Sequence, residues 1–209
     1  MSEKNRTRKT RYNFGMLTPG HLAASYLISQ SVRFKGHVLT TKEVLFIMAS
    51  GYVLDLDLLI TPLFNVKPSY HHFLPTHTPL FVVLVSLLGV VLLKKRIKPL
   101  VLGLAIISIF SHLVFDDIGY WLQLIGLQEE SKIPQIFWFY PFDWRRDVII
   151  QHVEQTRSGY ETISLYFSQA KANMILEFLL VSAAITSHFC LRLRDRRVKS
   201  THARIRATK

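Results

Sequence analysis

The chain has 209 residues, 49% of them apolar, and a formal net charge of +12 at pH 7. This length is compatible with one domain, and the positive mean hydropathy argues against an ordinary soluble fold. Five Lys/Arg lie in residues 1–11 and eight lie in Arg192–Lys209. Basic tails around an apolar core are typical of proteins at an anionic membrane surface. No zinc-finger, helix-turn-helix or RNA-binding signature supports nucleic acid as the partner, and the single Cys190 excludes a disulfide framework.

The N-terminal part of the chain is polar and then moderately apolar. Residues 1–15 are basic and show no hydrophobic periodicity, so we expect a disordered lead. Thr18 is the expected N-cap of a helix that has Pro19 in its first turn and runs to about Val32. This helix is short for a membrane span. A signal peptide is the alternative, although a compact leucine-rich core and a clean small-residue cleavage site are missing.

Four further segments are strongly apolar, and a long connection separates the last two. The connection, Leu122–Lys171, contains the aromatic run 137–144, which suits a membrane–water interface. The sequence predicts an all-α, polytopic membrane helix bundle with four to five apolar helices and a long helical or irregular connection. The expected integral-membrane domain covers 16–193, and a basic tail covers 194–209. The four apolar segments are Glu43–Phe64, Thr78–Leu93, Pro99–Trp121 and Ala172–Leu193.

The distribution of lysine and arginine predicts the orientation in the membrane. Residues 33–42, the turn Lys94–Lys98 and the C-terminal tail share one side and hold three, four and eight positive residues. The positive-inside rule therefore predicts a cytoplasmic C-terminus and places residues 65–77 on the opposite side. The basic N-terminus disagrees with this orientation if the first helix also spans the membrane.

A histidine-rich loop, Ser69–Thr78, lies between two apolar segments and contains His71, His72 and His77. A helix would place His72 and His77 about 140° apart around its axis. The two side chains can meet at one ion only through a turn, which Pro75 supplies. Thr78 is the expected N-cap of the next helix, with Pro79 at its first position.

Other metal-type ligands are predicted at the same membrane depth. Asp55 and Asp57 lie near the end of their apolar segment, and the spacing of His112 and Asp116 puts them on one helical face. His21 arrives there too if the first helix starts on that side. Ionisable residues in apolar segments are costly and indicate function. The alternatives are a helix-end cap for either Asp55 or Asp57 and a hydrogen-bonded bundle residue for His112.

Three more ionisable residues have blander interpretations. Asp117 is interpreted as a solvated residue or as a residue that contacts the metal ligands without binding the metal itself. Glu177 and His188 have no partners at helical spacing, so they are interpreted as interhelical polar contacts.

The ordered set of motifs resembles the inner-membrane-associated metal-dependent hydrolases, some of which are labelled LexA-binding. The resemblance covers about residues 16–145. The family's Pro-Asp-x-Asp starts with Leu54 here, and Phe73 and Leu74 replace its loop arginine and glycine. The His-x3-Asp pair is also similar to zinc-dependent phospholipase C and P1-type nucleases. The motifs are His21 after Thr-Pro, Leu54-Asp55-Leu56-Asp57, His72-x4-His77-Thr78, His112-x3-Asp116 and Phe139-Tyr140-Pro141-Phe142.

The expected function is that of a membrane-bound, metal-dependent hydrolase of a bacterial-type inner membrane. Asp57 is a further ligand or the general base, and it is the expected catalytic residue. Mixed imidazole and carboxylate donors suit a divalent metal, zinc first, with manganese or iron as alternatives. The expected substrate is a lipid or a phosphoester, and membrane lipids are the expected partners. The expected ligands are His21, Asp55, His72, His77, His112 and Asp116.

Two other classes of function stay open at this point. A metal-binding membrane protein without catalysis would have saturated coordination. An ion or proton transporter would need a polar line across the bilayer, whereas the cytoplasmic halves of these segments are almost purely apolar. Serine hydrolysis is less favoured, because the chain has no Gly-x-Ser-x-Gly motif.

Overall fold

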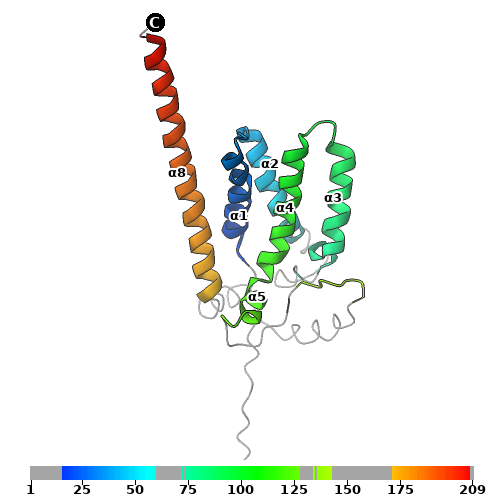
Figure 1. The fold of residues 1–209 in the computed structure, drawn as a ribbon. Helices are drawn as coiled ribbons and strands as arrows, with labels where there is room; N and C mark the ends of the chain where they lie inside the picture. The colour runs from blue at the N-terminus through cyan, green and yellow to red at the C-terminus, as the bar shows by residue number, and fades with distance from the viewer. Residues whose placement is uncertain are drawn as a thin grey trace, which may run out of the picture. The chain divides into compact units, whose positions relative to one another are not determined.

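The computed structural model describes residues 16–59, 72, 74–127, 134, 136–142 and 171–207 (Figure 1). Within these ranges the chain is helical and contains no strand, which confirms the all-α class. The expected disordered lead, His71 and most of the long connection lie outside the described residues. The α-helices are α1 (Thr18–Ser31), α2 (Thr41–Tyr52), α3 (Pro79–Leu93), α4 (Pro99–Asp116), α5 (Ile118–Leu124) and α8 (Lys171–Ala207). The 3-10 helices are η1 (Val32–Lys35), η2 (Val53–Leu59) and η5 (Pro75–His77).

The chain divides into two compact units, and each is described by itself. Unit 1 comprises Met1–Met16, Leu54–Val85 and Leu113–Met174. Unit 2 comprises Leu17–Val53, Ser86–His112 and Ile175–Lys209. Helices α3 and α4 each begin in one unit and end in the other. The expected integral-membrane domain 16–193 stays a prediction.

The core of unit 2 forms where α2 and α4 bury aliphatic side chains beside η1. A capping box starts α2: the Glu43 N–H donates to Thr40 Oγ1 at 3.3 Å, and the Thr40 N–H donates to the Glu43 carboxylate at 2.7 Å. Lys98 forms an ion pair with the same carboxylate at 3.0 Å. The buried core residues are Val32, Ile47, Val101 and Leu104.

Three helices of unit 2 approach closely at Gly51, near the end of α2. A Cβ atom at this position would lie 2.0 Å from Ser25 Oγ and 2.5 Å from Ser108 Oγ. Ser108 Oγ donates to Ser25 Oγ at 2.6 Å, and Ser25 Oγ donates to the His21 carbonyl at 2.8 Å. A glycine is therefore needed for α2 to reach the serines of α1 and α4.

The starts of two helices test the predicted caps. Thr78 caps α3 as expected, because its Oγ1 accepts from the Phe81 N–H at 3.3 Å. The expected cap at Thr18 is wrong by one residue: Leu17 is the N-cap, has extended backbone dihedrals and offers no side-chain acceptor. Its own N–H donates to the carboxylate of Glu177 in α8. A carboxylate from another helix thus stabilises the start of α1.

Two predicted helices are each divided. The segment Glu43–Phe64 is not one continuous α-helix, since α2 ends at Tyr52 and η2 follows. The segment Pro99–Trp121 consists of α4 and α5, with Asp117 between them. The Asp117 carboxylate accepts hydrogen bonds from the Trp138 indole N–H at 2.7 Å and from the Ile136 N–H at 3.3 Å. Asp117 therefore contacts a later part of the chain.

Two of the described helices are long and apolar enough to cross a membrane, fewer than the four to five predicted. They are Pro99–Asp116, with 18 residues, and Asn173–Arg194, with 22. Helices α1 and α2, with 14 and 12 residues, are too short for a 30 Å hydrocarbon core. Helix α3 is intermediate in length and exposes much of its apolar surface, namely Val83, Leu84, Leu87, Leu88, Val91 and Leu92.

Candidate metal centre

Two carboxylates of η2 meet the imidazole of His77 in unit 1. Asp57 Oδ2 lies 3.0 Å from His77 Nδ1, and Asp55 Oδ1 lies 3.8 Å from His77 Nε2. All three side chains are buried. A 3-10 helix has about three residues per turn, so residues two apart are separated by roughly 120° rather than the 160° of an α-helix. The change of helix type at Val53 therefore lets Asp55 and Asp57 face one histidine.

The end of α4 adds a third carboxylate to this group. Asp116 Oδ1 lies 3.4 Å from His72 Nε2, and Asp116 Oδ2 lies 3.9 Å from His77 Nε2. One ligand atom from each of these three residues lies within 4.8 Å of the others. The two imidazole rings meet edge-on with centroids 5.3 Å apart, because η5 begins at Pro75 and turns the chain between them.

The distances distinguish two kinds of contact around His77. The 3.0 Å between Nδ1 and Asp57 is a hydrogen-bond distance. The Nε2 separations of 3.8 Å from Asp55 and 3.9 Å from Asp116 exceed that range. Two ligands of one tetrahedral zinc ion, each about 2.0–2.2 Å from it, lie roughly 3.3–3.6 Å apart. The Nε2 side of His77 therefore has donors close to ligand spacing, while Asp57 holds the opposite nitrogen.

Competing effects set the pKa of His77. Burial lowers it, but the nearby carboxylates of Asp55, Asp57 and Asp116 stabilise the protonated ring and outweigh burial, so the pKa lies above the ordinary value of 6.5. Thr76 Oγ1 donates to Asp57 Oδ2 at 2.5 Å and fixes the carboxylate that faces Nδ1. These buried groups have the donor types and the charge that attract a divalent cation.

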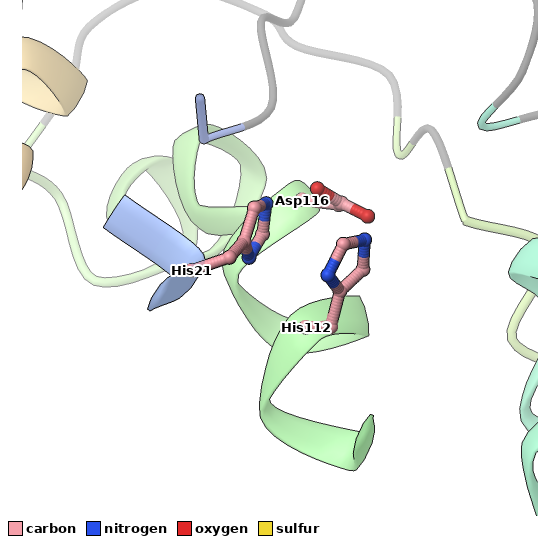
Figure 2. Close-up of side chains that lie close together, drawn as sticks. All are labelled: His21, His112 and Asp116. Atoms are coloured by element: carbon pink, nitrogen blue, oxygen red, sulfur yellow. The ribbon is translucent and has the colours of Figure 1, made fainter. Parts of the chain in front are cut away.

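In unit 2, two more predicted ligands lie together. The rings of His21 and His112 are stacked, with centroids 3.9 Å apart and planes 19° apart (Figure 2). His112 Nδ1 lies 2.8 Å from the Gly51 carbonyl. A carbonyl oxygen can only accept, so Nδ1 carries the proton and Nε2 has the lone pair that a metal requires. His112 precedes Asp116 by one turn of α4 (Figure 2).

The seven residues predicted to bind metal or to catalyse are thus divided between the two compact units. The sequence did not predict the residues that hold two of them by hydrogen bonds. Thr76 donates to Asp57, and the carbonyl of Gly51 accepts from His112. A hydroxyl residue beside His77 was visible in the sequence, whereas a backbone carbonyl leaves no signal there. Unit 1 holds Asp55, Asp57, His72, His77 and Asp116, and unit 2 holds His21 and His112.

The other ionisable residues form structural contacts. Asp117 is fully buried and holds the segment that contains Ile136 and Trp138, so it is not solvated. Glu177 and His188 make the interhelical polar contacts expected of them. His188 Nδ1 lies 3.1 Å from the Tyr26 hydroxyl, so both residues connect α8 to α1.

Comparison of the chain with protein-family models, with curated proteins and with solved structures finds no match. The resemblance to the membrane hydrolases therefore stays a prediction that depends on the motifs of this sequence.

Proposed function

We propose that the chain is a membrane-bound, metal-dependent hydrolase whose metal centre is built around His77. One observation supports this most strongly. Asp57 holds Nδ1 of the ring at 3.0 Å, and Nε2 faces carboxylate oxygens of Asp55 and Asp116 at 3.8 and 3.9 Å. A metal-binding histidine characteristically donates a hydrogen bond from its second ring nitrogen to a carboxylate, which fixes the ring and raises its basicity.

The donor set of unit 1 fits a divalent ion. His72, His77, Asp55 and Asp116 would hold it. In unit 2, the stacked imidazoles of His21 and His112 form a separate pair of donors. Two imidazoles with carboxylates favour zinc, with manganese or iron as alternatives. When bound there, a divalent ion supplies Lewis-acid polarisation of a carbonyl or phosphoryl group and makes water more acidic.

Asp57 has a defined task within this proposal. Its carboxylate accepts a hydrogen bond from the Nδ1–H of His77 and is itself held by a hydrogen bond from Thr76, so it would direct the Nε2 lone pair towards a bound ion. This arrangement favours an orienting role over the predicted role as ligand or general base. Loss of such an outer partner costs about 10–100-fold in metal affinity or activity.

The finer features of the membrane assignment also belong to the proposal. Exposed apolar side chains on α3 and α8 support further contact with lipid, consistent with four to five membrane helices. The basic residues at the end of α8 support a cytoplasmic C-terminus in an inner membrane. The substrate is then a lipid or a phosphoester reached from the membrane surface.

Metal analysis of purified protein tests the centre. We expect near-stoichiometric divalent ion in the native protein and loss of most of it in a His72→Ala/His112→Ala variant. His37→Ala is the matched control, because His37 is exposed and lies in neither group. Full metal content in the double variant would refute the site.

Two carboxylate variants separate a ligand from an orienting residue. Asp55→Asn should release the ion, whereas Asp57→Asn should lower affinity by about 10–100-fold and leave a site that excess metal refills. A screen with lipid and phosphoester substrates then tests catalysis. Metal-loaded protein without turnover of any of them would favour the non-catalytic metal-binding alternative.

A further inference from the structure

Unit 1 exposes a set of large apolar side chains that the metal centre does not use. They lie at the end of α5 and in the segment 136–142, and the Trp121 and Trp138 rings, 5.5 Å apart, bring these two parts together. We call them the apolar surface. Its members and their exposed fractions are Leu124 59%, Ile125 68%, Leu127 69%, Phe139 72% and Phe142 88%.

A buried carboxylate holds this surface in place. Asp117 is completely buried and accepts from the Trp138 indole at 2.7 Å and the Ile136 N–H at 3.3 Å. Hydrogen bonds to a buried carboxylate are among the stronger ones in proteins. The exposed Phe139 and Phe142 therefore belong to a segment that is anchored from inside the unit.

The chemistry of the surface selects its partner. Residues 118–127 and 136–142 contain no charged side chain, so these two ranges offer no charge to an ionic macromolecule. Helix α4, a candidate membrane span, ends at Asp116, and α5 begins at Ile118. The surface thus follows directly on the end of a span, and aromatic residues concentrate at the membrane–water interface. The partner that fits is the interfacial layer of a lipid bilayer.

The same stretch of chain links the surface to the metal centre. Asp116 faces His72 and His77, and the next residue, Asp117, anchors the apolar surface. We infer that the apolar surface lies in the bilayer interface and that the substrate of the metal centre is a membrane lipid rather than a water-soluble ester. The second half of this inference rests on the proposed hydrolase function.

The reaction is simple hydrolysis. The oxygen of water forms a bond to the acyl carbon or phosphorus of the lipid, and the bond from that atom to the leaving oxygen breaks. The proton lost by water is transferred to the leaving alcohol, so no oxidant or reductant is needed.

Fluorescence quenching by brominated phospholipids tests the membrane contact without any need for activity. The chain has three tryptophans, and Trp144→Phe leaves Trp121 and Trp138 beside the apolar surface. We expect strong quenching in vesicles and clearly weaker quenching in a Phe139→Ser/Phe142→Ser variant. Val38→Ser is the control, since Val38 is also an exposed apolar residue but belongs to unit 2. If brominated phospholipids do not quench the tryptophan fluorescence of the Trp144→Phe protein, the apolar surface does not contact the bilayer.

A ratio of activities tests the substrate class. Turnover of vesicle phospholipid, divided by turnover of bis(p-nitrophenyl) phosphate, should fall about tenfold or more in Phe139→Ser/Phe142→Ser, because less apolar area enters the interface. The ratio should be unchanged in Val38→Ser. An equal loss on both substrates would refute lipid access. No turnover by metal-loaded protein would refute the proposed hydrolase and the substrate class with it, while quenching would still decide the membrane contact.

Discussion

Two histidines use the same chemical device in different units. His77 Nδ1 meets a carboxylate of Asp57 at 3.0 Å, and His112 Nδ1 meets the carbonyl of Gly51 at 2.8 Å. An oxygen acceptor at Nδ1 directs the lone pair of a neutral imidazole to Nε2. The residue types of the ligands could be predicted from the sequence, because metals select donor atoms. The acceptor behind His112 could not, because a backbone carbonyl has no residue identity.

The pKa of His77 predicts how metal binding depends on pH. Its carboxylate neighbours raise this pKa above 6.5, so the metal-free ring keeps its proton to a higher pH than an ordinary histidine. A metal ion must displace that proton. Affinity should therefore fall about tenfold per pH unit once the pH drops below the raised pKa, starting at a higher pH than for an unperturbed histidine. Competition titrations with a chelator across this range measure it.

The comparison for this prediction is Asp57→Asn, which removes one of the carboxylates that raise the pKa. Its affinity should be lower overall, but the decline should begin at a lower pH. An affinity in the native protein that is independent of pH through the histidine range would contradict the proton competition.

At the scale of helices, the apolar segments could be predicted but the breaks within them could not. Hydropathy stays high across Tyr52 and Val53, although the chain changes there from α2 to η2. At the break after Asp116, the Asp117 carboxylate accepts a hydrogen bond from Trp138, twenty-one residues away in sequence. Local propensity contains no information about such long-range partners. Asp55 and Asp57 lie in η2, after the first break, and Asp116 is the last residue of α4, before the second.

Two glycine substitutions test the helix packing of unit 2. Gly51→Ala places a methyl group against Ser25 Oγ, which must rotate and lose its hydrogen bonds to the His21 carbonyl and Ser108. We expect a loss of about 1–3 kcal/mol in the free energy of unfolding. Gly103→Ala in α4 is the control, because nothing lies within 4 Å of a Cβ there. It should be neutral or stabilising by up to about 1 kcal/mol.

Thermal unfolding of both variants in detergent measures the difference. If Gly51→Ala unfolds at the same temperature as the native protein, the close approach of the three helices is not required. If Gly103→Ala is the less stable of the two, the packing of α4 differs from that described.

For the whole molecule, hydropathy identified which segments are apolar, but not how much of each is buried against the rest of the protein. Half of the apolar stretch of α4 is buried inside the protein, whereas almost none of the apolar stretch of α8 is buried. Both stretches pass the same test of length and composition. The short helices α1 and α2 pack against each other. A count of apolar segments taken one at a time does not include such packing. The number of membrane helices was therefore the least predictable feature.

The last prediction concerns sidedness in the membrane. His77, just before α3, and Asp116, at the end of α4, lie 3.9 Å apart, so these two helix ends belong at one depth. The turn Lys94–Lys98 joins the opposite ends of α3 and α4, and it holds four positive residues. By the positive-inside rule we expect this turn and the basic end of α8 on the cytoplasmic side. The metal centre should then lie near the opposite face.

Cysteine labelling of intact bacterial cells measures this arrangement. Cys190 is the single cysteine, so Cys190→Ser gives a background in which Ser69→Cys, Lys95→Cys and Ser200→Cys can be introduced one at a time. A membrane-impermeant maleimide should label position 69 in intact cells and positions 95 and 200 only after lysis. Labelling at 69 only after lysis, with 95 and 200 accessible from outside, would reverse the orientation. Labelling of 95 and 200 from opposite sides would instead show an odd number of crossings between them, whereas crossings by α4 and α8 alone would return the chain to the side from which it started.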